Sequence, residues 1–292
     1  MSDSLESLHH KIDSAAELGS VVRTMKALAA SSITQYERAV RSLDDYYRTV
    51  ELGLIACLRP SGTQLPRSTA RQPVTLCAVV FGSDQGLVGQ FNEVLCEYAL
   101  QQLQDLPGER RLLAVGERVQ GHLTAQGLPV VAREAVPNAI AAITATVVNL
   151  LATLEAQRAA GRELRVYLFH NRPRAAASYA PTMQCLLPLD RAWQQGLSGL
   201  KWPTGNLPQA IGPVAQTLEH LLREYLFISL FRACTESLAS ENASRLAAMQ
   251  RAEKNIDELL EGLQRDYHRQ RQSNIDAELF DVLAGFEALN RK

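Results

Sequence analysis

The sequence lacks three features that would each point to a class of protein. It has only five cysteines and no C-x-x-C pair, and an odd count argues against a disulfide framework. We expect reduced thiols that pack as small apolar side chains. No apolar run approaches the roughly 18 residues that a transmembrane helix needs, and the first residues, MSDSLESLHHK, lack the apolar centre of a signal peptide. Any membrane association is therefore expected to come through a partner.

An excess of charge of one sign is also missing. Lysine and arginine number 30 and aspartate and glutamate 31, so the whole chain favours neither nucleic acid nor an acidic membrane surface. Nucleic-acid partners are not predicted.

The sequence also has few motifs that are typical of catalytic or ligand-binding sites. The segment 81–89 (FGSDQGLVG) follows a strand-like run, but its spacing is G-x-x-x-G-x-x-G and the lysine of a phosphate loop is absent. A tight structural turn is the simpler interpretation. His9 and His10 have no acidic or thiol residues at metal-ligand spacing, and no G-x-S-x-G elbow occurs. We therefore predict a chain without catalytic, cofactor or metal sites.

The distribution of proline divides the chain into three segments. All twelve prolines lie from Pro60 to Pro213, so residues 1–59 and 214–292 contain no proline to break a helix. As continuous helices the two outer segments would be roughly 80 Å and 110 Å long. We predict an N-terminal helix (1–59), a central domain (60–212) and a C-terminal helix (213–292).

Both outer segments carry an apolar stripe at coiled-coil spacing. In the first, apolar residues recur in alternating steps of three and four, and in the second the stripe becomes less regular toward the end. The two stripes can cover each other if the helices pair in an antiparallel coiled coil. Since the second helix is the longer, part of it must project and needs another protein around it. The N-terminal stripe comprises Leu5, Leu8, Ile12, Ala15, Leu18, Val22, Met25, Ala29, Ile33, Tyr36, Val40, Leu43, Tyr47, Val50 and Leu54.

The central segment reads as alternating strands and helices. Short apolar runs occur at 74–81, 112–115, 130–132, 165–170 and 183–187, and helix-like stretches at 92–103 and 138–158 lie among them. This alternation predicts a small, mostly parallel sheet. The expected fold class is therefore α/β, with a Rossmann-like central domain and a long antiparallel coiled coil of the two terminal helices.

Several motifs, in order along nearly the whole chain, resemble those of one family. They are MKALAA (25–30), SDQGLVGQFN (83–92), LLPL (186–189), ASENASRLAAMQRA (239–252) and YHRQRQSNIDAEL (267–279). Together they resemble the gamma subunit of F-type ATP synthases, the central rotor stalk. The resemblance implies a chain that is itself not catalytic. It implies that the chain turns inside a hexamer of alpha and beta subunits and couples ion flow through a membrane ring to ATP synthesis or hydrolysis.

The resemblance also implies partners and positions. The partners would be the alpha, beta and epsilon subunits and the ring of c subunits, at the cytoplasmic face of a bacterial inner membrane. Contact with beta would involve Met25, Arg271 and Gln272. An apical bearing, in which an apolar sleeve permits rotation, would involve Phe280, Leu283 and Phe286. The foot would comprise Asp84, Gln85, Gly86, Lys201 and Trp202.

The chain departs from the family pattern at several places. Ser31 and Ser32 stand where lysine or arginine is usual, and Gln85 and Val88 replace an arginine and a cysteine. The departures suggest a divergent bacterial lineage, of the alternative F-type enzymes. Two other hypotheses stay open: a structural coiled-coil adaptor, which copurification with alpha and beta would test, and a small nucleotide-binding enzyme with helical arms, which nucleotide titration would test.

Overall fold

The computed structural model describes residues 4–61, 73–157, 162–174, 178–189, 193, 196–197, 200, 202–206, 208 and 211–290. Contacts divide the chain into two compact units. The coiled-coil unit contains the residues up to Ala29 and those from Leu246 onward, and the body unit contains Ala30–Arg245. Each unit is described by itself below.

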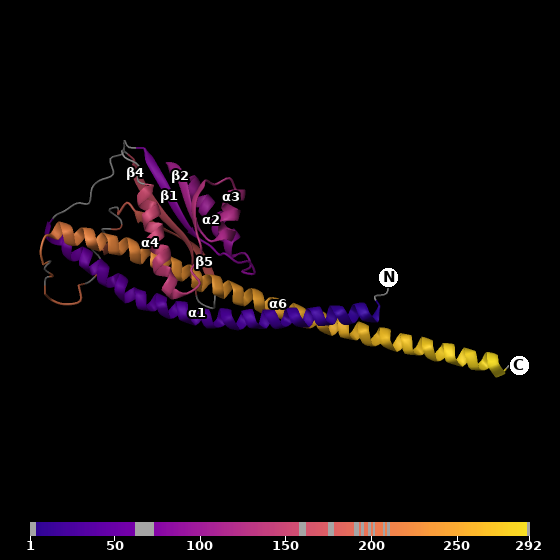
Figure 1. Cartoon of the computed structure of the whole chain (residues 1–292). Helices are drawn as coiled ribbons and strands as arrows, with labels where there is room; N and C mark the ends of the chain where they lie inside the picture. Colours follow the sequence, from indigo (N-terminus) through magenta and orange to yellow (C-terminus); the bar gives the residue numbers. More distant parts are fainter. Residues whose placement is uncertain are drawn as a thin grey trace. The chain divides into compact units, whose positions relative to one another are not determined.

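Two long helices run through the chain. Helix α1 spans Leu5–Ser61 and helix α6 spans Val214–Asn290 (Figure 1). Helix α6 begins at Val214, one residue after the start of the predicted segment 213–292, and α1 continues two residues past its predicted end at Arg59. Sequence signals locate a helix end only to within a residue or two, which accounts for the difference. No helix in the described part of the chain is long and apolar enough to cross a membrane.

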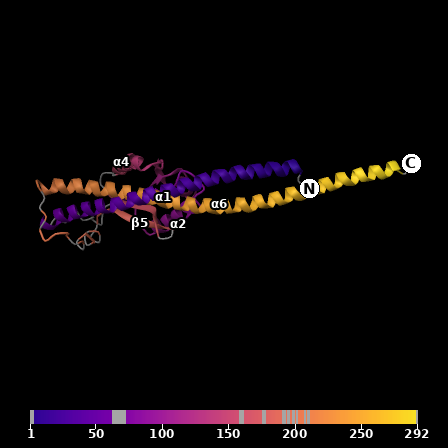
Figure 2. The ribbon, with the colours of Figure 1, turned by 90° about the horizontal axis from the view of Figure 1, so that it is seen from below.

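The two helices pair antiparallel within the coiled-coil unit (Figure 2). Near one end the rings of His9 and Tyr267 meet at 6.1 Å between centroids, and further along Lys26 pairs with Glu253. Residue numbers rise on one helix as they fall on the other. Gly19 lets the helices approach closely, since an added Cβ would lie 3.3 Å from Ile256 Cγ2.

The same antiparallel pairing holds within the body unit. Arg232 of α6 pairs with Asp44 of α1 at 2.9 Å, and a Cβ on Gly53 would lie 3.1 Å from Leu221 Cδ2. The predicted coiled coil is thus present in both units.

The body unit also contains a five-stranded sheet with the order β3-β2-β1-β4-β5. The first four strands are parallel and β5 is an antiparallel edge strand. This arrangement confirms the expected α/β class and the mostly parallel sheet. The strands are β1 (Val74–Phe81), β2 (Glu109–Val115), β3 (Val130–Glu134), β4 (Glu163–Pro173) and β5 (Tyr179–Leu187).

Strand β1 is buried on both faces, so the sheet separates two apolar cores. Alternate residues Leu76, Ala78 and Val80 pack with helices α2 (Phe91–Gln104) and α3 (Glu117–Ala125). The intervening residues Cys77 and Val79 pack with helix α4 (Ile140–Ala156) and with the body segments of α1 and α6. The long helices therefore form part of the core of the body unit.

Helix α3 was not among the expected elements. It has nine residues, only Val119 and Leu123 of them are buried, and it contains Gly121, a residue that disfavours helix. Two buried positions give too weak a period to mark a helix in the sequence.

Candidate functional site

The S-D-Q-G loop (Ser83–Gly86) follows the carboxyl end of β1 and is held by one hydrogen bond of its own and by two to Asn92 of α2. The Ser83 N–H donates to Asn92 Oδ1 at 3.0 Å, and Asn92 Nδ2 donates to Ser83 Oγ at 2.9 Å. Ser83 Oγ in turn donates to the Gln85 carbonyl at 2.9 Å. The Ser83 N–H, one of the loop groups that could cradle a phosphate, is therefore already bonded to α2.

Asp84 joins this loop to two neighbouring connections. Its Oδ1 accepts from the Glu117 N–H at the start of α3 (2.9 Å), and its Oδ2 accepts from the Val136 N–H (2.8 Å). A carboxylate at a helix N-terminus is favoured by the helix dipole. Both oxygens thus bond within the body unit, whereas Gln85 is exposed and Gly86 is half-exposed.

The loop is packed too tightly for side chains at two glycines. A Cβ on Gly82 would lie 2.2 Å from Val119 Cβ, and one on Gly116 would lie 2.7 Å from the Ser83 carbonyl oxygen. Gly116 also has φ of 117°, which favours glycine. The glycines of this region therefore serve close packing.

The two other residues predicted for the foot have different outcomes. Trp202 is half-buried, and its Nε1 donates to Thr204 Oγ1 at 3.1 Å. Lys201 lies outside the described residues. Contact between these residues and a partner remains a prediction.

A strip of buried polar side chains lies on α6 in the body unit. Ser237 Oγ donates to the Phe81 carbonyl at 3.0 Å, Ser240 Oγ donates to the Asn171 carbonyl at 2.9 Å, and Ser244 Oγ donates to the Val88 carbonyl. Spacings of three and four residues place these hydroxyls on one helix face. They bond the ends of β1 and β4 and the loop after β1 to α6. The motif at 239–252 thus contains residues that fasten the helix to the sheet, a role that sequence reasoning had not assigned.

Glu236 lies in this strip and is 3% exposed. Its Oε2 accepts from His170 Nε2 (2.8 Å) and Arg172 Nε (2.9 Å), and its Oε1 accepts from Arg232 Nε (2.9 Å). Burial by itself would raise the pKa of Glu236, but hydrogen bonds from His170, Arg232 and Arg172 and the charge interaction with His170 outweigh burial and lower it to about 2. Sequence reasoning missed this cluster. The only local signal is the four-residue spacing of Arg232 and Glu236.

Glu241 lies five residues further along α6 and is also buried, but there the effect of burial on the pKa outweighs that of its charged partner. It pairs with Arg245 at 2.7 Å, but burial dominates and raises the pKa of the Glu241 carboxyl. Two buried glutamates on one helix therefore have pKa values shifted in opposite directions.

In the coiled-coil unit, Met25 is half-buried and packs against the cluster of Val22, Met249 and Ile256. Its neighbour Lys26 pairs with Glu253. Met25 is thus a seam residue that keeps part of its surface accessible.

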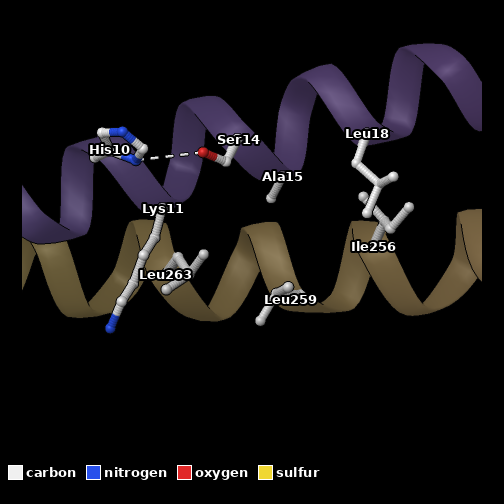
Figure 3. Close-up of a pocket in the computed structure, with 8 residues that line it drawn as sticks. All are labelled: His10, Lys11, Ser14, Ala15, Leu18, Ile256, Leu259 and Leu263. Atoms are coloured by element: carbon white, nitrogen blue, oxygen red, sulfur yellow. Dashed lines mark hydrogen bonds between the residues drawn. The ribbon is translucent and has the colours of Figure 1, made fainter.

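A shallow groove of about 470 Å³ lies between the helices of the same unit (Figure 3). Leu18 on α1 and Leu259 on α6 flank it and are each more than half exposed, and Lys11 extends across α6 beside Leu263. Five of the eight side chains that line the groove are aliphatic. Its lining residues are His10, Lys11, Ser14, Ala15, Leu18, Ile256, Leu259 and Leu263.

Residues 271–286 of α6 are exposed without exception. Arg271 and Gln272 begin this segment, which we call the tip segment, and Arg271 makes no ion pair with any described residue. Phe280 is 69% exposed and Phe286 is 63% exposed. The tip segment also exposes Ile275, Leu279, Val282 and Leu283.

The described residues contain no group of three or more histidines, cysteines, aspartates or glutamates that could hold a metal ion. Two features of α6 stand out among the described residues: the strip of buried polar side chains in the body unit and the exposed apolar side chains of the tip segment.

Comparison with known proteins defines the class to which this architecture belongs. The family model described as ATP synthase matches residues 4–289, so the chain belongs to the ATP synthase family. Its relatives specify the subunit. The ATP synthase gamma chain of Anaeromyxobacter dehalogenans is 28% identical, over 98% of this chain and 99% of that protein, and the gamma chain of Pelotomaculum thermopropionicum is 26% identical with the same coverage.

Solved structures share the fold. A chain of the Euglena gracilis mitochondrial ATP synthase, in a structure of OSCP, F1 and c-ring, matches with a TM-score of 0.68 at 19% identity, over 98% of this chain and 94% of that chain. A rotor structure of the same enzyme matches with a TM-score of 0.65 at 18% identity, over 93% of this chain and 98% of that chain. The expected resemblance is confirmed.

Proposed function

We propose that this chain is the central rotor (gamma) subunit of an F-type ATP synthase. The observation that carries the proposal is the tip segment, where one helix exposes six large apolar side chains along residues 275–286. Contiguous exposed apolar surface of this kind marks a surface that a partner covers. Helix α6 carries this surface, and a long helix with an exposed apolar segment is what a shaft enclosed by other subunits would have.

The proposed partners are the alpha and beta subunits, epsilon and the membrane c-ring. The solved structures with this fold include the central stalk with the c-ring of one mitochondrial ATP synthase and the F1 and c-ring assembly of another, which supports these partners for the present chain. Within the complex, Met25, Arg271 and Gln272 would contact beta. Arg271 is suited to charge-assisted bonds with acidic loops. Phe280, Leu283 and Phe286 would form the apical bearing.

The chain would act by binding the beta subunits unequally as it turns. A rotor changes the nucleotide affinity of a beta subunit only through contacts that differ among the conformations of beta. The chain itself would do no chemistry, and nucleotides would bind to its partners. The three segments 1–59, 60–212 and 213–292 would serve as N-terminal shaft helix, foot domain and C-terminal shaft helix. The complex would lie at the cytoplasmic face of a bacterial inner membrane.

Coexpression with the alpha and beta subunits of the same organism tests the proposal. Native mass should show three alpha, three beta and one copy of this chain, and the steady ATPase of the complex should fall when this chain is omitted. A chain that never joins alpha and beta would contradict the proposal and favour the adaptor hypothesis.

A matched pair of variants sharpens that test. Replacing Phe280, Leu283 and Phe286 by serine removes three of the six large apolar side chains, while replacing Asp276, Glu278 and Asp281 by serine changes polar side chains of the same segment. The first set should weaken retention in the complex and the second should not. Equal effects would show that the apolar side chains have no special part in binding.

A further inference from the structure

We propose that Glu236 is a positioning residue at the joint through which torque passes between the α/β sheet and the two long helices. This inference rests on the rotor function proposed above. It concerns the place where α1 and α6 are fastened to the sheet, all of which lies in the body unit.

One buried carboxylate connects the sheet to α6. Its Oε2 receives hydrogen bonds from His170 and Arg172, which both belong to β4, while Glu236 itself belongs to α6. His170 is fully buried, and Arg172 lies partly in solvent. The two donors are two residues apart in β4, a spacing that places both side chains on the same face of the strand, so a single acceptor holds the end of β4.

Arg232 extends the connection to α1. Its Nε donates to Glu236 Oε1 (2.9 Å), and its Nη2 pairs with Asp44 of α1 (2.9 Å). The guanidinium also lies 5.5 Å from the centre of the Tyr47 ring, another residue of α1. A continuous series of contacts therefore runs from β4 to Glu236, from Glu236 to Arg232 on the same helix α6, and from Arg232 to α1.

The chemistry of these contacts suits a joint that bears load. Charge-assisted hydrogen bonds are short and directional, whereas apolar contact is non-directional and permits one element to slide along another. In a buried site such bonds are also little screened by salt. The serine bonds of the strip, at Ser237 and Ser240, are neutral and weaker. Glu236 is the acceptor on which three donors converge, so its loss removes more of the joint than the loss of any one donor.

The test uses the assembled enzyme in inverted membrane vesicles that contain the Glu236→Gln variant. Two quantities are measured together: the rate of ATP hydrolysis, and ATP-driven ion uptake followed with a potential-sensitive dye, which responds whichever ion is moved. We expect ion uptake per ATP hydrolysed to fall by about twofold or more, because the amide leaves two arginines and a histidine without their shared anion. A wild-type ratio in assembled E236Q enzyme would overturn the proposal.

Two further comparisons separate positioning from a general loss of structure. Glu219→Gln makes the same change in an exposed pair with Arg223 on the same helix, and it should leave the ratio unchanged. His170→Gln keeps an N–H donor and should retain more coupling than His170→Leu, which has none.

The two His170 variants also test the positioning role if the E236Q enzyme does not assemble. Equal ratios for the two His170 variants would then overturn the inference, while a higher ratio for glutamine would support it. Failure of the wild-type chain to join alpha and beta is a different result, which would contradict the rotor function itself.

Discussion

Two segments of helix α6 show the reverse of the usual relation between polarity and burial: the one with many polar side chains is buried, and the one with many apolar side chains is exposed. Between Ser229 and Arg245 nearly every side chain is buried or half-buried, although serines, a threonine and two glutamates lie among them. In the tip segment every side chain is exposed, although leucine, isoleucine, valine and phenylalanine recur there. Burial along this helix is therefore decided by what lies beside each segment.

The contrast shows which interactions the chain completes by itself. Buried polar groups are stable only when hydrogen-bonded, and Ser237, Ser240 and Glu236 all find partners in the body unit. The apolar side chains of the tip segment have no such cover within the described residues. One segment is thus completed by intramolecular contacts, and we expect a second protein to cover the other.

The largest expected effect comes from the same substitution, glycine to alanine, made at a tightly packed position in the body unit and at an open position on α6. Gly82→Ala places a Cβ 2.2 Å from Val119 Cβ in the packed body, so we expect a loss of about 3 kcal/mol or more in unfolding free energy. Gly262→Ala on α6 has no neighbour within 4 Å and should stabilise by up to about 1 kcal/mol, because alanine favours the helix. Urea unfolding of the full chain measures both, and a shared sign would contradict the contrast.

The two buried glutamates should respond oppositely to pH. The pKa of Glu236 falls from 4.5 to about 2 on folding, so its stabilisation is present above pH 4.5 and is lost as the pH falls toward 2. The pKa of Glu241 is raised, so its charge opposes folding at neutral pH and that penalty disappears on acidification.

Urea unfolding as a function of pH checks both directions. Glu236→Gln should lose on the order of 3 kcal/mol at neutral pH, and the gap from the wild type should narrow in acid below pH 4.5. Glu241→Gln should show the reverse trend, gaining relative to the wild type as the pH rises. Parallel curves for both variants would show that neither carboxyl is shifted as described.

A smaller loss is expected from Ser240→Ala. The change leaves the buried Asn171 carbonyl without the hydroxyl that bonds it at 2.9 Å, which costs about 1–3 kcal/mol. The exposed Ser273 in the tip segment is a matched control, since its replacement by alanine should change the unfolding free energy by less than about 0.5 kcal/mol. Equal effects would remove the distinction between the two segments.

The smallest effect on the chain alone is expected where large side chains are removed from the tip segment. Phe280→Ala with Phe286→Ala should alter the unfolding free energy of the isolated chain by no more than about 0.5 kcal/mol, because both rings are already in water. The same double variant should bind alpha and beta less well, as measured by native mass over a dilution series. A large loss of stability in the isolated chain would mean that the rings pack within it.

From the sequence, the helices and strands could be predicted more accurately than the contacts between their side chains. Strand β1 was predicted with its observed bounds, Val74–Phe81, because an unbroken apolar run is typical of a strand buried on both faces. The long helices were predicted from missing proline and regular stripes. Glu236 was not singled out, since its partners at 170 and 172 are more than sixty residues away and a glutamate on a helix is ordinarily solvated. Asp84 was assigned to a partner contact, and only the structure shows both of its oxygens bonded internally.

Hydrogen exchange on the isolated chain and on the chain assembled with alpha and beta tests the central claim most directly. We predict that amides of residues 271–286 exchange quickly in the isolated chain and become protected on assembly, while those of residues 229–245 are protected in both states. Tip amides that exchange equally fast before and after assembly would contradict the claim that a partner covers this segment.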